Sequence, residues 1–171
     1  MLPAPIPDDE TERLAALHRI MLLDTPPEER FDRLVEFAAH ELDMPIALIS
    51  LLDEGRQWFK SRVGVSLAET PRDISFCAHT ILGEELLVIE DASEDERFAD
   101  NPLVTGEAHI RFYAGAPLKS PSGHKVGTLC VLDTRPRRLD HIERATLEAL
   151  RDLIGSELAA REAERLAGGA G

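Results

Sequence analysis

Two reactive side chains, Cys77 and His79, stand close together near the middle of the 171-residue chain. A cysteine and a histidine could act as a nucleophile and its base, or as two metal ligands. Ser75 before them and Gly83 after them predict a short helix over residues 76–82. Residues two apart on a helix lie about 200° around its axis, so these side chains diverge. We therefore expect that Cys77 is not a catalytic nucleophile.

The position of Cys77 could still make its thiol somewhat acidic. It falls in the first turn of the expected helix, where the helix dipole favours a thiolate. The other cysteine, Cys130, is about fifty positions away, so no resolving cysteine lies nearby in the sequence. Free cysteines most often lie in the core. We expect Cys77 to be a small buried thiol and His79 a capped or surface imidazole.

Polar residues gather between residues 91 and 101 and have two interpretations. They could form a lid over a pocket, with Arg97 meeting an anionic ligand. They could also be cap and turn residues, which already accounts for Ser93, Glu96 and Asn101. The second interpretation is favoured. The group consists of Asp91, Asp95, Arg97, Asp100 and Asn101.

Two other stretches could shape a pocket. Trp58 and Phe59 are neighbours on an expected strand, so one faces each side of the sheet and each is more readily explained as core. Three small residues at 114–116 leave room for a ligand or for the close approach of a helix. Both explanations stay open.

Composition restricts the functions that the chain could have. The 32 acidic and 19 basic residues give a net charge of -13, which opposes nucleic-acid binding. The first residues lack the features of a signal peptide, and the most apolar stretch, residues 46–52, is too short to cross a bilayer. Two cysteines fit a reducing compartment, so we expect a cytoplasmic protein. The six histidines lack metal-ligand spacing.

Two helices are expected before the first strand. Asp9 and Glu12 resemble a capping box ahead of an apolar stripe of Leu14, Leu17 and Met21. Thr25 is expected to cap a second helix. That helix has a proline at its first position, and its core-facing residues are Phe31, Leu34, Val35, Ala38 and Leu42.

The remaining pattern predicts an antiparallel sheet. Strands at 46–52 and 57–63 form a hairpin, and strands at 110–119 and 125–132 form another. Between the hairpins lie the short helix at 76–82, a strand at 86–90 and two small helices within 91–106. A long helix from Leu139 closes the chain. Hairpins exclude a doubly wound parallel fold, so the expected class is α+β.

Six motifs in this order resemble a GAF domain of the bacterial sensor type, often found ahead of diguanylate cyclases and histidine kinases. They are LLDTPPEERFD from Leu22, RQWFK from Arg56, SFCAHTI from Ser75, RFADNP from Arg97, RFYAGAPL from Arg111 and GTLCVLD from Gly127. The resemblance covers about residues 10–160 of one domain spanning 1–171, with 1–8 and 167–171 expected to be flexible. It implies a central antiparallel sheet, terminal helices on one face and a pocket under crossover helices on the other. No residues remain for an output domain, so a stand-alone domain is expected.

Three activities known in the family find little support in these motifs. Bilin-binding relatives carry a cysteine followed directly by histidine, whereas Ala78 intervenes here. Free methionine sulfoxide reductases of this fold use three cysteines, and this chain has two. The Asn-Lys-Phe-Asp-Glu signature of cyclic-nucleotide-binding relatives does not occur.

The expected function is therefore a non-catalytic sensory domain that binds a small molecule or a signalling partner and has no identified cofactor. The alternatives are a thiol-dependent redox enzyme using Cys77, of the free methionine sulfoxide reductase kind, and a dimeric interaction domain whose pocket is filled by its own side chains. The candidate ligand-binding residues are Trp58, Phe76, Cys77, His79, Asp91, Arg97, Phe98, Asn101 and Tyr113.

A homodimer through the terminal helices is also expected. In the closing helix, one side carries Leu147, Leu150, Ile154 and Leu158 for the core. Apolar residues remain on its other sides, and such helices usually meet a partner as well as their own core. They are Ile142, Ala149, Leu153, Ala160 and Ala163. In sensor relatives this is also where a signal would leave the domain.

Overall fold

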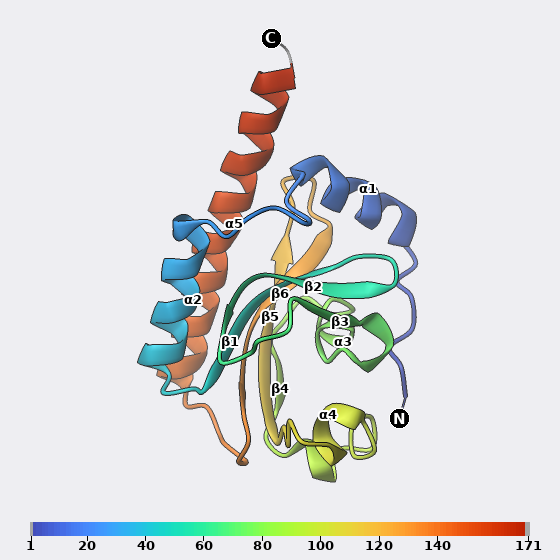
Figure 1. Cartoon of the computed structure of the whole chain (residues 1–171), viewed down its shortest axis with the longest axis vertical. Helices are drawn as coiled ribbons and strands as arrows, with labels where there is room; N and C mark the ends of the chain where they lie inside the picture. Colours follow the sequence, from blue (N-terminus) through green and yellow to red (C-terminus); the bar gives the residue numbers. More distant parts are fainter. Residues whose placement is uncertain (1, 170–171) are drawn as a thin grey trace.

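A six-stranded sheet with helices on both faces forms the centre of the computed structural model, which describes residues 2–169 (Figure 1). Its strand order is β3-β2-β1-β6-β5-β4, and every neighbouring pair is antiparallel. The elements are α1 (Glu10–Ile20), α2 (Glu29–Glu41), β1 (Ile46–Leu52), β2 (Arg56–Val63), β3 (Glu69–Pro71), the 3-10 helix η1 (Arg72–Ile74), α3 (Cys77–Thr80), β4 (Leu87–Ile89), the 3-10 helix η2 (Ala92–Glu94), α4 (Pro102–Thr105), β5 (Phe112–Lys119), β6 (Lys125–Asp133) and α5 (His141–Gly169).

The predicted α+β class and both predicted hairpins are confirmed. β1 pairs with β2 and β5 pairs with β6, while β1 and β6 meet at the centre of the sheet. The sequence pattern missed β3, because a three-residue strand that ends in Pro71 shows no alternation. Residues 1, 170 and 171, which belong to the termini expected to be flexible, lie outside the described residues.

The first helix begins as predicted but is not held by a capping box. Asp9 occupies the N-cap position without a side-chain hydrogen bond to the helix. Instead, Glu10 accepts hydrogen bonds from Arg13 at 2.9 Å and from Arg72 at 2.6 Å. Met21 ends the helix in the left-handed conformation and is 57% exposed, so it leaves the expected apolar stripe. The buried apolar residues of α1 are Ala16, Leu17 and Ile20.

The prediction that Thr25 caps α2 is wrong, because the helix begins only at Glu29. Consecutive prolines at 26 and 27 favour extended backbone, and Glu28 is still extended. The Thr25 hydroxyl donates to the carbonyl of Leu22 at 2.5 Å and accepts a hydrogen bond from Lys60. The predicted core stripe is nevertheless confirmed, since Phe31, Val35, Ala38 and Leu42 are buried and Leu34 packs against the core.

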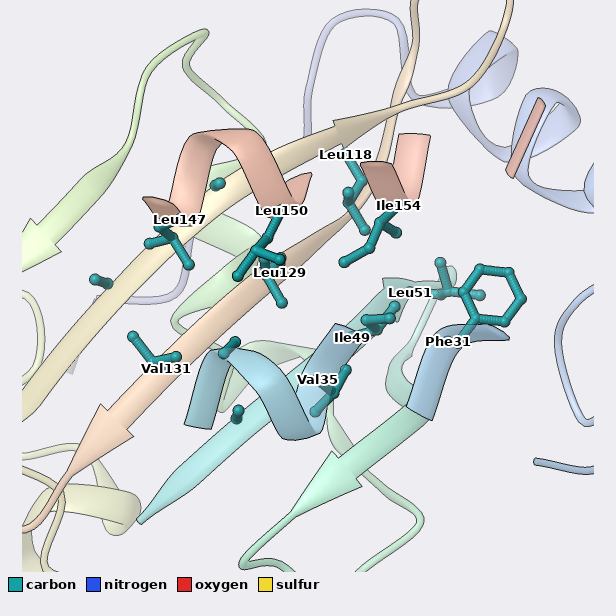
Figure 2. Packing of buried hydrophobic residues seen from close by; sticks show 14 of the residues in the cluster. Phe31, Val35, Ile49, Leu51, Leu118, Leu129, Val131, Leu147, Leu150 and Ile154 are labelled. Atoms are coloured by element: carbon teal, nitrogen blue, oxygen red, sulfur yellow. The ribbon is translucent and has the colours of Figure 1, made fainter. Parts of the chain in front are cut away.

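Residues that alternate along the central strands form two separate cores. On one face, α2 and α5 pack on the sheet, and Figure 2 shows Ile49, Leu51, Leu129 and Val131 against side chains of both helices. On the other face, strand residues meet the crossover between β2 and β5. This second core contains Leu48, Leu52, Phe59, Tyr113, Cys130 and Leu132 from the strands, with Phe76, Ile81, Ile89, Phe98 and Val104 from the crossover.

The helices α2 and α5 are joined to the sheet by a group of charges that we call the Glu28 cluster, consisting of Glu28, Arg30, Lys60 and Arg161. The side chain of Lys60, on β2, has no exposed surface, and its Nζ lies 2.7 Å from the Glu28 carboxylate. Arg161 of α5 and Arg30 of α2 lie 3.0 and 3.1 Å from the same carboxylate. Arg161 also donates to the carbonyl of Met21 at 3.2 Å. Beyond the sheet, α5 continues past α1, as Figure 1 shows.

We predict that Glu28→Gln destabilises the fold by about 2 to 3 kcal/mol, because it leaves Lys60 buried without its counter-charge. Urea unfolding measures this cost. Glu29→Gln is the matched control, since its ion pair with Arg33 is exposed and is expected to contribute less than about 0.5 kcal/mol.

The pH dependence of stability provides a second readout of the same variant. Burial alone would raise the pKa of Glu28, but Lys60, Arg161 and Arg30 lower it below the ordinary carboxyl value. The contribution is therefore present at neutral pH and lost as the pH falls through the carboxyl range. Equal costs for Glu28→Gln and Glu29→Gln would show that the cluster does not join the layers.

Candidate functional site

A small, partly open cavity lies between the sheet and the crossover segments. Its volume is about 130 Å³, and its walls are almost wholly apolar. None of the lining residues is of a charged type. They are Ile46, Leu48, Gln57, Phe59, Val65, Leu67, Thr70, Phe76, Cys77, Leu103, Ala108, Ile110, Tyr113 and Leu132.

The cavity has an exposed mouth and a buried floor. Leu67, 57% exposed, and the exposed Ala108 stand at the mouth, on the segments that follow β2 and α4. Phe76, Cys77 and Tyr113 are buried at the floor. A molecule that enters would therefore pass between two loops and end against α3 and the sheet.

The polar wall of the cavity is built around Gln57. Its amide donates to the Thr70 hydroxyl at 3.1 Å and accepts a hydrogen bond from the Ser75 hydroxyl at 2.8 Å. Ser75 in turn accepts from the backbone N–H of Ala78 at 3.1 Å, so it caps α3 as predicted. These bonds tie β2, β3 and α3 together and fix the orientation of the amide.

A group of buried hydroxyls surrounds the sulfur of Cys77 at the floor. Thr128 donates to Sγ at 2.9 Å, and Tyr113 donates to it at 3.3 Å. The Tyr113 hydroxyl also bonds Thr80 at 2.6 Å. The sulfur of Cys130 lies 3.7 Å away. The fold thus places beside Cys77 the second cysteine that its sequence neighbourhood lacks.

The two thiols differ in acidity. Burial alone would raise the pKa of Cys77, but hydrogen bonds from Cys130, Ser50, Thr128 and Tyr113 outweigh it and lower the pKa to about 7. Burial and the adjacent Cys77 raise the pKa of Cys130. Burial, followed by the charge of Cys77, also raises the pKa of Tyr113. Cys77 is therefore the group of this cluster that loses its proton first.

The small residues at 114–116 have two different roles. Ala114 and Ala116 face the helices and belong to the first core. Gly115 faces the opposite side, where a Cβ would overlap the Tyr113 hydroxyl and crowd the Thr80 hydroxyl. The glycine thus gives space to the hydrogen bond between Tyr113 and Thr80, and the alanines let the helix layer approach the sheet.

Aromatic rings fill the space behind the cavity. The Phe76 ring lies 4.5 Å from that of Phe98 and 5.2 Å from that of Tyr113. His79 packs edge-on against Phe98 at 4.8 Å, and it does not line the cavity. Burial and the nearby charge of Arg97 lower the pKa of His79. Phe98 and His79 therefore support the floor from outside.

The polar residues of the crossover are engaged in local structure. Asp91 caps η2 by accepting from the backbone N–H of Ser93 at 3.0 Å, and Asn101 caps α4 by accepting from Leu103 at 2.8 Å. The Asn101 side chain also donates to the carbonyl of Ile74. Arg97 pairs with Asp95 at 2.8 Å. None of these side chains lines the cavity.

Trp58 lies on the opposite face of the sheet, in the first core. There it borders a wider groove of about 590 Å³ between β2 and the start of α2. Two charged residues of that groove are engaged, since Lys60 binds Glu28 and Ser61 donates to Asp32 at 2.6 Å. The groove is larger than the cavity, but its lining is mixed polar and apolar, whereas the cavity is almost wholly apolar.

Of the nine candidate residues, the structure brings Phe76, Cys77 and Tyr113 together at the cavity. The sequence pattern missed Gln57, Thr70, Ile110 and the loop residues of the mouth. Gln57 could have been found from its position, because it lies two residues before Phe59 on the same strand and shares its face. Thr70 and the mouth residues lie where no periodic pattern exists.

Residues 2–169 contain neither a metal-binding cluster nor a membrane-spanning helix. No three His, Cys, Asp or Glu side chains are grouped so that they could hold a metal ion. No helix in this part of the chain has both the length and the apolar character needed to span a membrane.

An antiparallel sheet with terminal helices on one face and a cavity under short crossover helices on the other defines a class of α+β domains. The family model of the GAF domain matches residues 26–158. The chain belongs to the GAF domain family.

Comparisons with known proteins give one close relative and many similar folds. A Pseudomonas aeruginosa protein named as a cyclic di-GMP phosphodiesterase is 46% identical over 137 residues, covering 80% of this chain and 23% of that protein. The chain thus spans about a quarter of its relative. The GAF domain of an Acinetobacter phosphoenolpyruvate-protein phosphotransferase has a TM-score of 0.60 at 21% identity, covering 93% of this chain and 98% of the other.

A second similar structure is an enzyme. Free methionine-R-sulfoxide reductase from Neisseria meningitidis, determined with its substrate, has a TM-score of 0.61 at 14% identity and covers 96% of this chain and 98% of its own. At such identities these structures confirm the fold of the chain and leave its chemistry open.

Proposed function

We propose that this chain is a regulatory GAF domain that binds a small, largely apolar molecule in the cavity beneath its crossover and passes the change to α5. The observation that carries the proposal is the apolar cavity with a buried floor and with polar groups at Gln57 and Thr70. A closed apolar site with a few placed polar groups is typical of ligand pockets.

The size of the cavity restricts the class of ligand. Apolar cavities of about 150 Å³ hold benzene or xenon. Drug-sized ligands occupy about 300 to 1,000 Å³. At about 130 Å³, this cavity suits a molecule of benzene size with one or two polar groups, and it is too small for a nucleotide or a tetrapyrrole.

The cavity also disfavours the reductase alternative. Free methionine sulfoxide carries an ammonium group and a carboxylate, and a buried charge needs a partner. No residue that lines the cavity is of a charged type. The cysteine pair is compatible with thiol redox chemistry, but the uncharged walls do not fit free methionine sulfoxide. The phosphodiesterase activity in the relative's name belongs to a protein of which the matched residues cover only 23%, so it is no part of the function proposed for this domain.

The route from the cavity to α5 runs through β2. Phe59 faces the cavity on one side of the sheet. The next residue, Lys60, faces the helices on the other side and belongs to the Glu28 cluster. Because the two residues share one backbone, a shift of β2 at the cavity moves the buried ammonium of Lys60. Glu28 and Arg161 then carry the shift to α2 and α5.

We further propose that a second copy of the chain packs on α5. Ile142 and Leu153 are 65% and 54% exposed, whereas Leu147, Leu150, Ile154 and Leu158 face the core. The first helix contributes little to such an interface beyond Met21, because Leu17 is buried in the core. A signalling partner could meet the same surface. The two buried free thiols are consistent with a cytoplasmic location.

We predict that benzene binds in the cavity. Methyl resonances of Leu48, Ile110 and Leu132 are expected to shift saturably in NMR titrations, because these residues line the walls. Leu132→Phe, which fills the cavity, should weaken binding at least about tenfold. Leu166→Phe, at an exposed position on α5, is the matched control and should leave binding unchanged. Cavity methyls that shift no more than those of Leu129 and Val131 would indicate a pocket filled by the protein's own side chains.

We predict that light scattering gives about twice the 18.9 kDa mass of one chain at micromolar concentration. Leu153→Glu places a charge in the proposed contact and should return the mass to that of one chain. Leu67→Glu changes an equally exposed leucine away from α5 and should leave the mass unchanged. A wild-type chain that stays near 19 kDa would refute the dimer.

A further inference from the structure

Cys77 and Cys130 form a pair whose redox chemistry the ligand proposal does not use. They come from α3 and β6, and their sulfurs lie 3.7 Å apart. Both side chains are buried, with exposed fractions of 2% and 0%. A disulfide needs its sulfurs about 2.05 Å apart. A local movement of α3 by roughly 1.5 Å would therefore join them.

The surroundings distinguish the two sulfurs. Cys77 accepts hydrogen bonds from the hydroxyls of Thr128 and Tyr113, and the Thr128 hydroxyl is also bonded to Ser50 at 2.9 Å. Hydroxyls that point at a sulfur stabilise its thiolate form. The lowered pKa of Cys77 and the raised pKa of Cys130 agree with this assignment. One sulfur is thus prepared to attack, while the other keeps its proton.

Access distinguishes them as well. Cys77 is part of the cavity floor, whereas Cys130 is not among the lining residues and lies on the sheet behind it. A molecule that passes Leu67 and Ala108 reaches the Cys77 sulfur first. The volume of about 130 Å³ admits a two-oxygen oxidant easily but excludes a peptide thiol or disulfide.

We propose that Cys77 and Cys130 are a peroxide-reactive thiol pair, which hydrogen peroxide converts to a disulfide at the floor of the cavity. The Cys77 thiolate attacks one peroxide oxygen, so an S–O bond forms, the O–O bond breaks and hydroxide leaves to become water. Cys130 then attacks the sulfenic sulfur, the S–S bond forms and the S–O bond breaks. The released hydroxyl takes the Cys130 proton and leaves as a second water. The two thiols lose two electrons, and one peroxide gains them.

The disulfide would change both the cavity and its supports. It would draw α3 toward β6, and Thr128 and Tyr113 would lose the thiolate that they bond. Oxidation therefore reshapes the floor of the ligand site. The pair needs the cavity only as an entry path, so failure of benzene binding would leave this inference standing.

Intact mass spectrometry of the full chain under mild hydrogen peroxide tests the proposal. The wild type is expected to lose about 2 Da, and a thiol reductant added after unfolding in urea should reverse this. In Cys130→Ser the sulfenic acid should persist and be captured at Cys77 by a dimedone probe added together with the urea. Cys77→Ser should show neither product, with circular dichroism confirming that both variants fold. A wild type that keeps both thiols, or that is oxidised first at Cys130, would overturn the proposal.

A variant of Thr128 tests whether Cys77 reacts because hydroxyls bond its sulfur or only because the cavity exposes it. Thr128→Val removes the 2.9 Å donor and should shift the pH profile of peroxide oxidation toward the ordinary thiol range, with at least about a tenfold slower rate at pH 7. Thr105→Val removes a hydroxyl outside the cluster and should leave the profile unchanged. Equal profiles in both variants would show that the hydroxyls do not activate Cys77.

Discussion

The long strands of the sheet are buried on both faces. Successive residues of a strand therefore pack against different layers, one against the helices and the next against the crossover. Along β2, Trp58 and Lys60 face the helix layer, while Gln57 and Phe59 face the cavity. The backbone between them cannot move on one face alone. A sheet in this position has two functions, since it forms one wall of the ligand site and also supports the helices on its far side. The Glu28 cluster holds the helices to the sheet by ion pairs. The side chain of Lys60 has no exposed surface, so water cannot take the place of its partner Glu28.

The second core explains why the cavity is small and why it holds a reactive pair. Phe76 and Tyr113 form part of its floor, and Phe98 packs against Phe76 behind it, so these rings occupy space that a large ligand would need. Tyr113 and Thr128 bring hydroxyls into this apolar layer, and a buried hydroxyl needs a partner. The Cys77 sulfur is a shared partner of both hydroxyls, beside Thr80 for Tyr113 and Ser50 for Thr128. The hydrogen bonds that order the floor therefore also lower the pKa of Cys77.

The sequence allowed most of the fold to be predicted, because its signals are local. Apolar runs separated by turn residues within 46–63 and 110–132 predicted the hairpins, and the stripe at Phe31, Val35 and Ala38 predicted the core face of α2. The site was less predictable, since it depends on contacts between distant segments. Nothing near Cys77 in the chain indicates that Cys130 lies 3.7 Å away. Thr25 fits the local rule for a helix cap, yet Lys60, thirty-five residues later, engages its hydroxyl. Tertiary contacts decided these positions against local preference.

If β2 couples the two faces of the sheet, filling the cavity changes the helices on the other side. Hydrogen–deuterium exchange of the full chain, measured with and without saturating benzene, tests this coupling. We expect altered exchange in β2, in residues 24–31 and in residues 154–166 of α5, and no change in any of these segments in Leu132→Phe. Changes confined to residues 64–70 and 103–110, around the cavity mouth, would contradict it.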